Sequence, residues 1–379
     1  MIDLAREFPQ QPELLYLNHA AVAPWPQRTG DAISAFAAEN VSQGAMGYPR
    51  WNEQMASLRE RGRILLNAAD AADIALLKNT SEGLSVVAGG LKWQRGDRIV
   101  GIADEFPSNR IVWQALRPQG VEFVAVDIHA NDDPEAALLA ACDEHTRLLA
   151  ISSIHYASGL RLDLARLAQG CRERGILICV DAIQSLGASA MDVQALQLDF
   201  VIADGHKWLL GPEGTALFYC RPTLREQLTL HQFGWYMVEH HMDFDHQNWR
   251  PAASARRFEC GSPNMLGIHG LNASLGLLLE IGLDEVEHAL LARSRHLMEV
   301  IGQSPELRLL SNPTQGRYLG IVSLTAANGD ADGLFRHLWD NRVVCARRGD
   351  GVRLSPHFYT PYETLDQALQ LACEFDGED

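Results

Sequence analysis

The chain has 379 residues, a hydrophobic fraction of 47% and a formal net charge of −16. This length predicts two domains with ample apolar material for a core. The acidic balance argues against nucleic acid or an anionic membrane as the main partner, and no apolar run is long enough to span a bilayer.

The N-terminus and the cysteines both predict a cytoplasmic protein. Residues 1–7 lack the basic-then-apolar order of a signal peptide. The seven cysteines are scattered without a C-x-x-C pair, so neither a disulfide framework nor a zinc ribbon is indicated, and free thiols in a reducing compartment are expected. The stretch 239–246 is rich in His and Asp, but its spacing matches no familiar metal motif. We interpret it as a solvated loop and predict no metal site.

Apolar periodicity divides the first part of the chain into alternating helices and strands. A short strand at 15–17 runs into a small-residue turn that begins with Asn18 and His19. Helices are predicted at 28–40, 51–69, from 79 onward, at 134–142 and at 162–174, and strands at 74–78, 98–103, 121–126 and 146–151. A loop is expected at 44–49.

Two consecutive apolar strands then end on polar side chains. The first, 176–181, ends on Asp181 and is followed by Gln184, and the second, 199–204, leads to Lys207. Strands covered on both faces are apolar throughout, and ligands of open α/β sheets bind beyond the carboxyl ends of such strands. A reaction site is therefore the leading hypothesis. The alternative is that Asp181 caps a helix and Lys207 is a surface lysine.

The last third of the chain predicts a compact α+β domain that the first few residues join. After a strand at 215–220, helices are predicted at 267–281, 284–303 and 331–339, and strands near 307 and at 320–324, 343–344 and 352–355.

A lysine at a buried strand end has a specific chemistry. Desolvation lowers the pKa of an amine, and a deprotonated amine can form a Schiff base with a carbonyl. Pyridoxal phosphate is the obvious carbonyl, because it needs a lysine for that bond and an acid opposite its pyridine nitrogen. Lys207 and Asp181 suit these two roles, and Gln184 can reach the ring hydroxyl.

The motifs that carry these residues resemble the class V aminotransferase family of pyridoxal-phosphate enzymes, which includes cysteine desulfurases, selenocysteine lyases, kynureninases and isopenicillin-N epimerase. The family segments V-D-x-x-Q and S/D-G-H-K read 180–184 and 204–207 here. The resemblance covers nearly the whole chain. It implies an α/β fold of the aspartate aminotransferase type, with a large cofactor domain built on a mostly parallel sheet (16–264) and a small α+β domain (1–15 and 265–379).

The resemblance also implies cofactor contacts. The family's T/S-T/S-E-G turn holds the phosphate, which gives that role to Thr80 and Ser81 at a helix start. Phe106 stands where desulfurases have a histidine over the ring, and a phenyl face can stack there. His206 is expected near the phosphate. Ser262, in a segment that resembles R-F-E-x-G-T-P-N, takes the role of a residue that reaches the partner's phosphate, which implies a homodimer with shared sites.

An amino-acid substrate follows from the same resemblance. Arg353 matches the family arginine that holds the substrate carboxylate, and a bidentate fork explains why it is arginine. Asn18, His19 and Tyr156 are expected on the substrate side, with a backbone-bonded turn histidine as an equal alternative for His19. The sequence does not choose which arginine, if any, reads an acidic side chain among Arg50, Arg161, Arg347 and Arg348.

Three departures from the family pattern bear on the reaction. Cysteine desulfurases carry a nucleophilic cysteine on a loop just before the Arg353 strand, whereas here that loop is short and Cys345 precedes the turn. Phe106 cannot move protons as the desulfurase histidine does. Asp204 replaces a phosphate-binding serine, and its role stays open.

We therefore predict an enzyme that acts on an amino acid through a Lys207 Schiff base with pyridoxal phosphate, with class V aminotransferase as the primary label. The alternatives are a kynureninase-like lyase, a cysteine desulfurase or selenocysteine lyase, or an epimerase, because the step after Lys207 removes the α-proton differs among them. A nucleotide-binding Rossmann protein is disfavoured, since no G-x-G-x-x-G follows the first strand.

Overall fold

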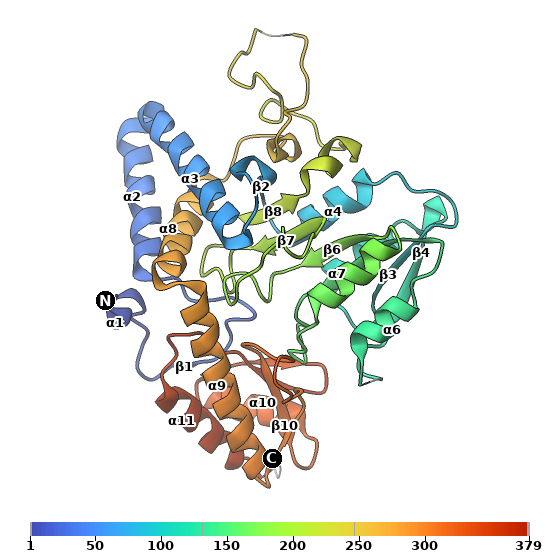
Figure 1. Ribbon diagram of the computed structural model, residues 1–379. Helices are drawn as coiled ribbons and strands as arrows, with labels where there is room; N and C mark the ends of the chain where they lie inside the picture. The colour runs from blue at the N-terminus through green and yellow to red at the C-terminus, as the bar shows by residue number, and fades with distance from the viewer. Residues whose placement is uncertain (1, 131, 246, 377–379) are drawn as a thin grey trace.

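The computed structural model describes residues 2–130, 132–245 and 247–376, and a seven-stranded sheet forms its centre (Figure 1). The strand order is β2-β8-β7-β6-β5-β3-β4. The strands are β2 (Ile74–Leu77), β3 (Arg98–Ile102), β4 (Glu122–Val126), β5 (Thr146–Ser152), β6 (Leu177–Asp181), β7 (Phe200–Asp204) and β8 (Ala216–Cys220). Strand β8 runs antiparallel to both neighbours and the other pairs are parallel. The mostly parallel sheet is confirmed, and the carboxyl ends of the other six strands lie at one edge.

Apolar side chains cover both faces of this sheet. Alternate residues of a strand point to opposite faces, and in β7 Val201 and Ala203 belong to one hydrophobic cluster while Phe200 and Ile202 belong to another. The helices that supply the first cluster are α3 (Tyr48–Leu66), α6 (Pro134–Ala140), α7 (Leu164–Glu173), α8 (Met265–Ile281) and the first part of α9 (Leu283–Gln303), and those of the second are α4 (Thr80–Gly90) and α5 (Ser108–Gln114). The near-continuous apolar strands of the sequence follow from this double burial.

The C-terminal part forms a second layer of strands and helices below the main sheet in Figure 1. Its antiparallel sheet has the order β12-β13-β10-β9. The elements are α9 (Leu283–Gln303), β9 (Leu307–Leu309), β10 (Val322–Ala326), α10 (Ala331–Asp340), β11 (Val343–Val344), β12 (Ala346–Arg348), β13 (Gly351–Leu354) and α11 (Tyr362–Cys373). The N-terminal segment contributes β1 (Leu15–Tyr16), which pairs in parallel with β11.

A third hydrophobic cluster holds this C-terminal part together. It joins Leu15 and Leu17 to side chains from Leu297 onward, whereas the buried side chains of α8 lie in the first cluster. The division into 16–264 and 1–15 plus 265–379 stays a prediction, and positions 1 and 377–379 lie outside the described residues. From the packing we propose that the border falls within α9.

Several stretches differ from the prediction. The expected loop at 44–49 is a 3-10 turn (Gly44–Gly47) between α2 (Gln27–Gln43) and α3. Pro49 is the second residue of α3, where a helix needs no N–H partner, so a proline that reads as a loop signal stands inside a helix. Helices α5 and α11 and strand β12 were missed altogether. The remaining short helix, α1 (Leu4–Glu7), packs near α2.

Part of the chain between residues 229 and 245 projects away from the body of the fold (Figure 1), while Tyr236 and Met237 in the same stretch are buried. The expected loop at 239–246 falls here, and residues 239–245 form turns while His246 lies outside the described residues. In the described part of the chain, no single helix is long and apolar enough to cross a membrane, and the pair α8 and α9, which reaches that length together, is bent by 83°.

Candidate active site

Lys207 lies in the turn that follows β7, at the carboxyl edge of the sheet. The turn is fixed by backbone hydrogen bonds, because Gly205 N–H donates to the Thr215 carbonyl at 2.9 Å and Gly211 N–H to the Gly205 carbonyl at 2.8 Å. A Cβ on Gly205 would lie 2.9 Å from the Thr215 carbonyl oxygen. Only glycine permits this close approach, which explains the glycine two residues before the lysine.

The Lys207 amine is buried, and both positive and negative side chains act on its charge. Its side chain is 8% exposed, and Nζ lies 5.5 Å from the centroid of the Phe106 ring. Burial lowers the pKa of Lys207 to about 8, and the positive charges of Arg353 and Arg348 act in the same direction, against the carboxylates of Asp181 and Asp204. The amine is therefore closer to its reactive, deprotonated form at neutral pH than a surface lysine.

Asp181 ends β6 next to the lysine. Its Oδ1 accepts a hydrogen bond from Ile183 N–H at 3.0 Å. Burial raises the pKa of Asp181 to about 6 and the charge of Asp204 adds to the rise, while the Ile183 N–H and the charge of Lys207 oppose it. A carboxylate in this position is ready to pair with a cationic ligand group.

Gln184 connects three segments of the site. Its Nε2 donates to the Ala20 carbonyl at 3.1 Å, and its Oε1 accepts from Trp208 Nε1 at 2.8 Å. The amide thereby ties the turn after β1 and the Lys207 turn to the end of β6, and its second N–H is left for a ligand.

The start of α4 reaches the same place from β2. Asn79 caps the helix by accepting from Glu82 N–H at 2.8 Å, and Thr80 Oγ1 accepts from Asp204 N–H at 3.1 Å. Ser81 Oγ donates to Ser108 Oγ at 2.8 Å. A helix start with hydroxyls and free N–H groups favours an anion, so the geometry suits the predicted phosphate role.

Glu105 is a buried carboxylate that our sequence reasoning overlooked. It follows β3 and accepts from Ser152 N–H at 2.9 Å, Ser152 Oγ at 2.8 Å and Phe106 N–H at 2.9 Å. Burial and the charge of Asp181 raise the pKa of Glu105 to about 7. In the sequence it stands beside Phe106, which we interpreted instead. Its role becomes visible only in the folded structure, through its burial and its hydrogen bonds with Ser152.

Arg353 lies on β13 and is 1% exposed. Its Nη1 donates to the Tyr156 carbonyl at 2.7 Å and its Nη2 to Asn18 Oδ1 at 3.5 Å, while Nε has no partner. Burial lowers the pKa of Arg353 to about 9. The fold thus brings together the predicted substrate residues Arg353, Asn18 and Tyr156, and the Tyr156 ring lies edge-on to Phe106 at 5.4 Å.

His19 is fully engaged. Its Nδ1 lies 2.8 Å from the Ser355 carbonyl and its Nε2 lies 2.7 Å from Tyr359 Oη. Burial lowers the pKa of His19 to about 4. A substrate contact would have to replace one of these bonds, whereas the existing bonds fix the turn that carries Asn18.

His206 and Asp204 leave polar atoms without a hydrogen bond. His206 Nδ1 lies 3.1 Å from Asp204 Oδ1, yet both atoms are buried without a hydrogen-bond partner. Ser262 lies apart from this group, exposed on the loop that follows Phe258.

These residues fit pyridoxal phosphate. The amine of Lys207, the carboxylate of Asp181 and the start of α4 supply a Schiff-base donor, a partner for a pyridinium and a phosphate seat. Arg353 Nε, which is buried without a hydrogen-bond partner, is an atom that a polar ligand would satisfy.

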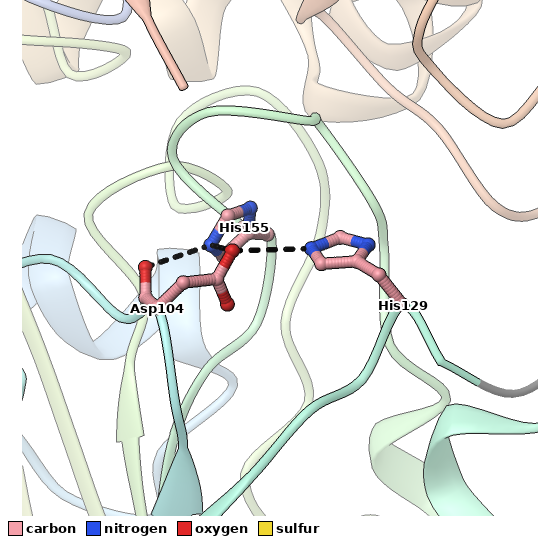
Figure 2. Close-up of side chains that lie close together, drawn as sticks. All are labelled: Asp104, His129 and His155. Carbon is pink, nitrogen blue, oxygen red and sulfur yellow. Dashed lines mark hydrogen bonds and ion pairs between the residues drawn. The ribbon is translucent and has the colours of Figure 1, made fainter. Parts of the chain in front are cut away.

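Asp104, His129 and His155 form a cluster beside this site (Figure 2). Their ligand atoms lie within 4.8 Å of one another, which raises the question of a metal. Ser158 N–H, however, donates to His155 Nδ1 at 3.2 Å, and His155 Nε2 lies 3.1 Å from the Asp104 carbonyl oxygen. Both ring nitrogens of His155 thus have partners within the protein, and we interpret the cluster as a hydrogen-bonded one.

Cys345 is unsuited to act as a nucleophile. It follows β11, is 2% exposed and belongs to the third hydrophobic cluster, and burial raises its pKa to about 12. A reactive cysteine needs a lowered pKa and access.

Comparisons with known proteins match nearly the whole chain. The model of the aminotransferase class-V family matches residues 15–362. A probable cysteine desulfurase of Methanothermobacter thermautotrophicus is 30% identical over 386 residues, which cover 96% of this chain and 95% of that protein. A cysteine desulfurase of Salmonella agona is 30% identical over 345 residues, 89% of this chain and 83% of that one.

Solved structures confirm the predicted fold class. A lysine-to-alanine mutant of C-DES with glycine covalently linked to its PLP cofactor superposes with a TM-score of 0.91 at 24% identity, covering 99% of this chain and 100% of that one. A complex of the cystine C–S lyase C-DES with its product cysteine persulfide gives 0.90 at 24% identity, covering 97% and 99%. The cysteine desulfurase CsdA of Escherichia coli gives 0.86 at 23% identity, covering 99% of both chains.

Proposed function

This chain belongs to the aminotransferase class-V family, and from that premise we propose that it is a pyridoxal-phosphate enzyme that cleaves a carbon–sulfur bond at the β-carbon of an amino acid. The proposal places it with the lyases of the family, and it dispenses with a cysteine nucleophile. Transamination, the primary label from the sequence, becomes the main alternative outcome of the test.

The cofactor would be held by residues that already converge. Pyridoxal phosphate supplies an aldehyde that takes up an amine and a ring that accepts the electron pair of the broken C–H bond. Lys207 would hold the aldehyde as a Schiff base, Asp181 would pair with the ring nitrogen, and Thr80 and Ser81 with the α4 N–H groups would bind the phosphate. Phe106 would stack on the ring, and Gln184 would face the ring hydroxyl.

The chain's own groups then carry the reaction. Arg353 holds the substrate carboxylate with the part of its fork that Tyr156 and Asn18 leave free. The Lys207 amine, once free, would take the α-proton of the substrate. The bond between the β-carbon and sulfur breaks, and the sulfur leaves with the electron pair. After hydrolysis the products are pyruvate, ammonia and the released thiol or persulfide.

One observation carries the choice of reaction, namely the burial of Cys345. A desulfurase that attacks the substrate sulfur needs a thiolate on a loop before the carboxylate-binding strand. Here β12 and β13 are joined by a tight turn at 349–350 and the nearby thiol has a pKa raised to about 12. Elimination needs no such thiolate, and the cystine C–S lyase with the same fold supports this route.

The test uses the small number of lysines. The chain has lysine only at 78, 92 and 207, so borohydride reduction of the protein with bound pyridoxal phosphate, followed by peptide mass mapping, assigns the Schiff base without ambiguity. We expect the peptide that contains Lys207 to carry the added mass of the reduced cofactor. In Lys207→Ala, both this added mass and the visible absorption band should be absent. Lys92→Ala, at an exposed position, is the matched control and should keep both.

Product analysis then distinguishes the reactions. Pyruvate and ammonia released in equal amounts from a sulfur amino acid support elimination. A keto acid formed without ammonia would show that the enzyme is an aminotransferase and not a lyase. Alanine formed together with an enzyme-bound persulfide would point to a desulfurase. No label on Lys207 would refute the cofactor assignment itself.

A further inference from the structure

Of the four arginines that the sequence left as candidates for reading an acidic substrate group, three are occupied. Arg50 pairs with Glu39 at 2.8 Å, Arg161 with Glu287 at 2.6 Å and Arg347 with Asp332 at 2.7 Å. Their partners lie on the protein, so none is available without breaking an ion pair. Arg348 remains.

Arg348 lies on the same face of the C-terminal sheet as Arg353. In the antiparallel pair β12–β13, Arg348 is opposite Gly351 and Arg347 is opposite Val352. Since side chains alternate between faces, Arg348 and Arg353 share one face, while Arg347 points to the other, where it meets Asp332 of α10. Gly351 has no side chain between the two arginines.

The charge of Arg348 reaches the reaction centre. It contributes to the lowered pKa of both Lys207 and Arg353. Its Nη1 donates to the Arg347 carbonyl at 2.8 Å, which orients the half-buried side chain but does not neutralise it. Among the residues that the structure describes, no carboxylate forms an ion pair with either Arg348 or Arg353.

We propose that Arg348 binds a second anionic group of the substrate, so that the site takes amino acids carrying a carboxylate or similar anion beyond the β-carbon. This inference rests on the proposed function. A substrate with one carboxylate satisfies Arg353 and leaves a second cation unpaired. A substrate with two anions neutralises both, and charge-assisted hydrogen bonds to arginine are the stronger kind.

The strand geometry separates the two anion positions. Arg348 and Arg353 are diagonal neighbours on adjacent antiparallel strands, and such residues lie about 7–8 Å apart. Their two guanidinium groups can therefore hold two separate carboxylates. A single carboxylate shared by both arginines is the competing arrangement, and binding of simple acids distinguishes the two.

The first experiment measures binding without turnover. Glutarate carries two carboxylates and butyrate one, and neither has an amine that can react. Calorimetry on the protein with bound pyridoxal phosphate should give glutarate an affinity at least 10-fold above butyrate. Arg348→Met should remove that advantage and leave butyrate unchanged. Arg347→Met, whose side chain points to the opposite face, should keep it.

Kinetics supply the second arm. With cystine, which has two carboxylates, Arg348→Met should lower kcat/KM by about 10- to 100-fold through KM, since a hydrogen bond to a charged group is lost. With S-methylcysteine, which has one, the change should stay within about 3-fold.

Two results would overturn the inference. Equal binding of glutarate and butyrate by the unaltered protein would exclude a second anion site. Parallel loss of both ligands in Arg348→Met would mean that the two arginines share one carboxylate. Both results leave the Schiff-base label on Lys207 untouched, so they differ from a failure of the proposed function, which abolishes that label.

Discussion

Glu105 shows how much charge the site buries. Burial and, to a smaller extent, the charge of Asp181 raise the pKa of Glu105 to about 7 from 4.5. Because the folded state holds the proton more tightly than the unfolded state, folding stability falls as the pH rises from about 4.5 to about 7. In the cofactor-free protein, Glu105→Gln should flatten the plot of unfolding free energy against pH in this window.

Urea unfolding at a series of pH values measures the effect. The matched control is Glu60→Gln, whose carboxyl has a pKa lowered by the hydrogen bond from Arg63, so that its titration lies below the window. An unchanged slope in Glu105→Gln would show that Glu105 is already ionised throughout.

Arg353 should not tolerate lysine. Lysine keeps the positive charge but loses the planar fork that holds Tyr156 and Asn18 while binding a carboxylate. Arg353→Lys should raise KM for the amino acid by about 10- to 100-fold, from the loss of charge-assisted hydrogen bonds. The visible band of the Lys207-bound cofactor should persist. Retention of KM would remove Arg353 from the carboxylate site.

At the scale of elements, the position of α4 depends on a glycine. A Cβ on Gly83 would lie 2.7 Å from the Ile202 side chain on β7, so Gly83→Ala should push the helix off the sheet and cost about 1–3 kcal/mol. It should also weaken binding of pyridoxal phosphate, because α4 carries Thr80 and Ser81. Gly30→Ala in α2, where nothing lies within 4 Å, should instead stabilise by about 0.5–1 kcal/mol. Thermal unfolding and cofactor titration measure both.

The ends of β3 and β4 are linked by Asp104 and His129, whose side chains lie 3.4 Å apart (Figure 2). The hydrogen bond that His129 donates to the Asp104 carboxylate raises the pKa of His129 above 6.5. Protonated His129 therefore contributes stability below its unfolded-state pKa, and the contribution disappears as the pH rises through the folded-state pKa.

Asp104→Asn should lower the pKa of His129, measured by NMR of histidine ring carbons with His129→Asn for assignment. An unaltered pKa would mean that the contact is absent in solution.

The strand ends could be predicted because local signals agree there. The apolar strands before Asp181 and Lys207 are buried on both faces. Polar residues are disfavoured in such a core, so those that follow directly after the strands indicate a functional site. Glu105 and Arg348 could not be assigned from sequence, since their roles depend on Asp181 and Arg353, which only folding brings near. Helix α11 was missed because it opens directly after Pro361 behind a segment that we interpreted through Arg353 alone.

At the scale of the whole molecule, the exposed Ser262 predicts that the sites are shared within a homodimer. Ser262→Ala should weaken binding of pyridoxal phosphate about 10-fold, because one hydrogen bond to a charged phosphate is lost. Mixed dimers of Ser262→Ala and Lys207→Ala should regain tight binding in one of two sites, since each such site combines an intact lysine with the partner's intact serine. Light scattering gives the oligomeric state. A monomer, or mixed dimers without recovery, would contradict the prediction.

The pairing of β1 with β11 has a consequence for protein synthesis. Leu15 and Tyr16 leave the ribosome early, but Val343 and Val344, with which they pair, are made near the end. At about 5–20 residues per second, β1 waits on the order of tens of seconds for its partner strand. The main sheet and Lys207 are complete well before then. A nascent chain interrupted late in translation would therefore carry the Schiff-base lysine but lack the arginine that holds the substrate.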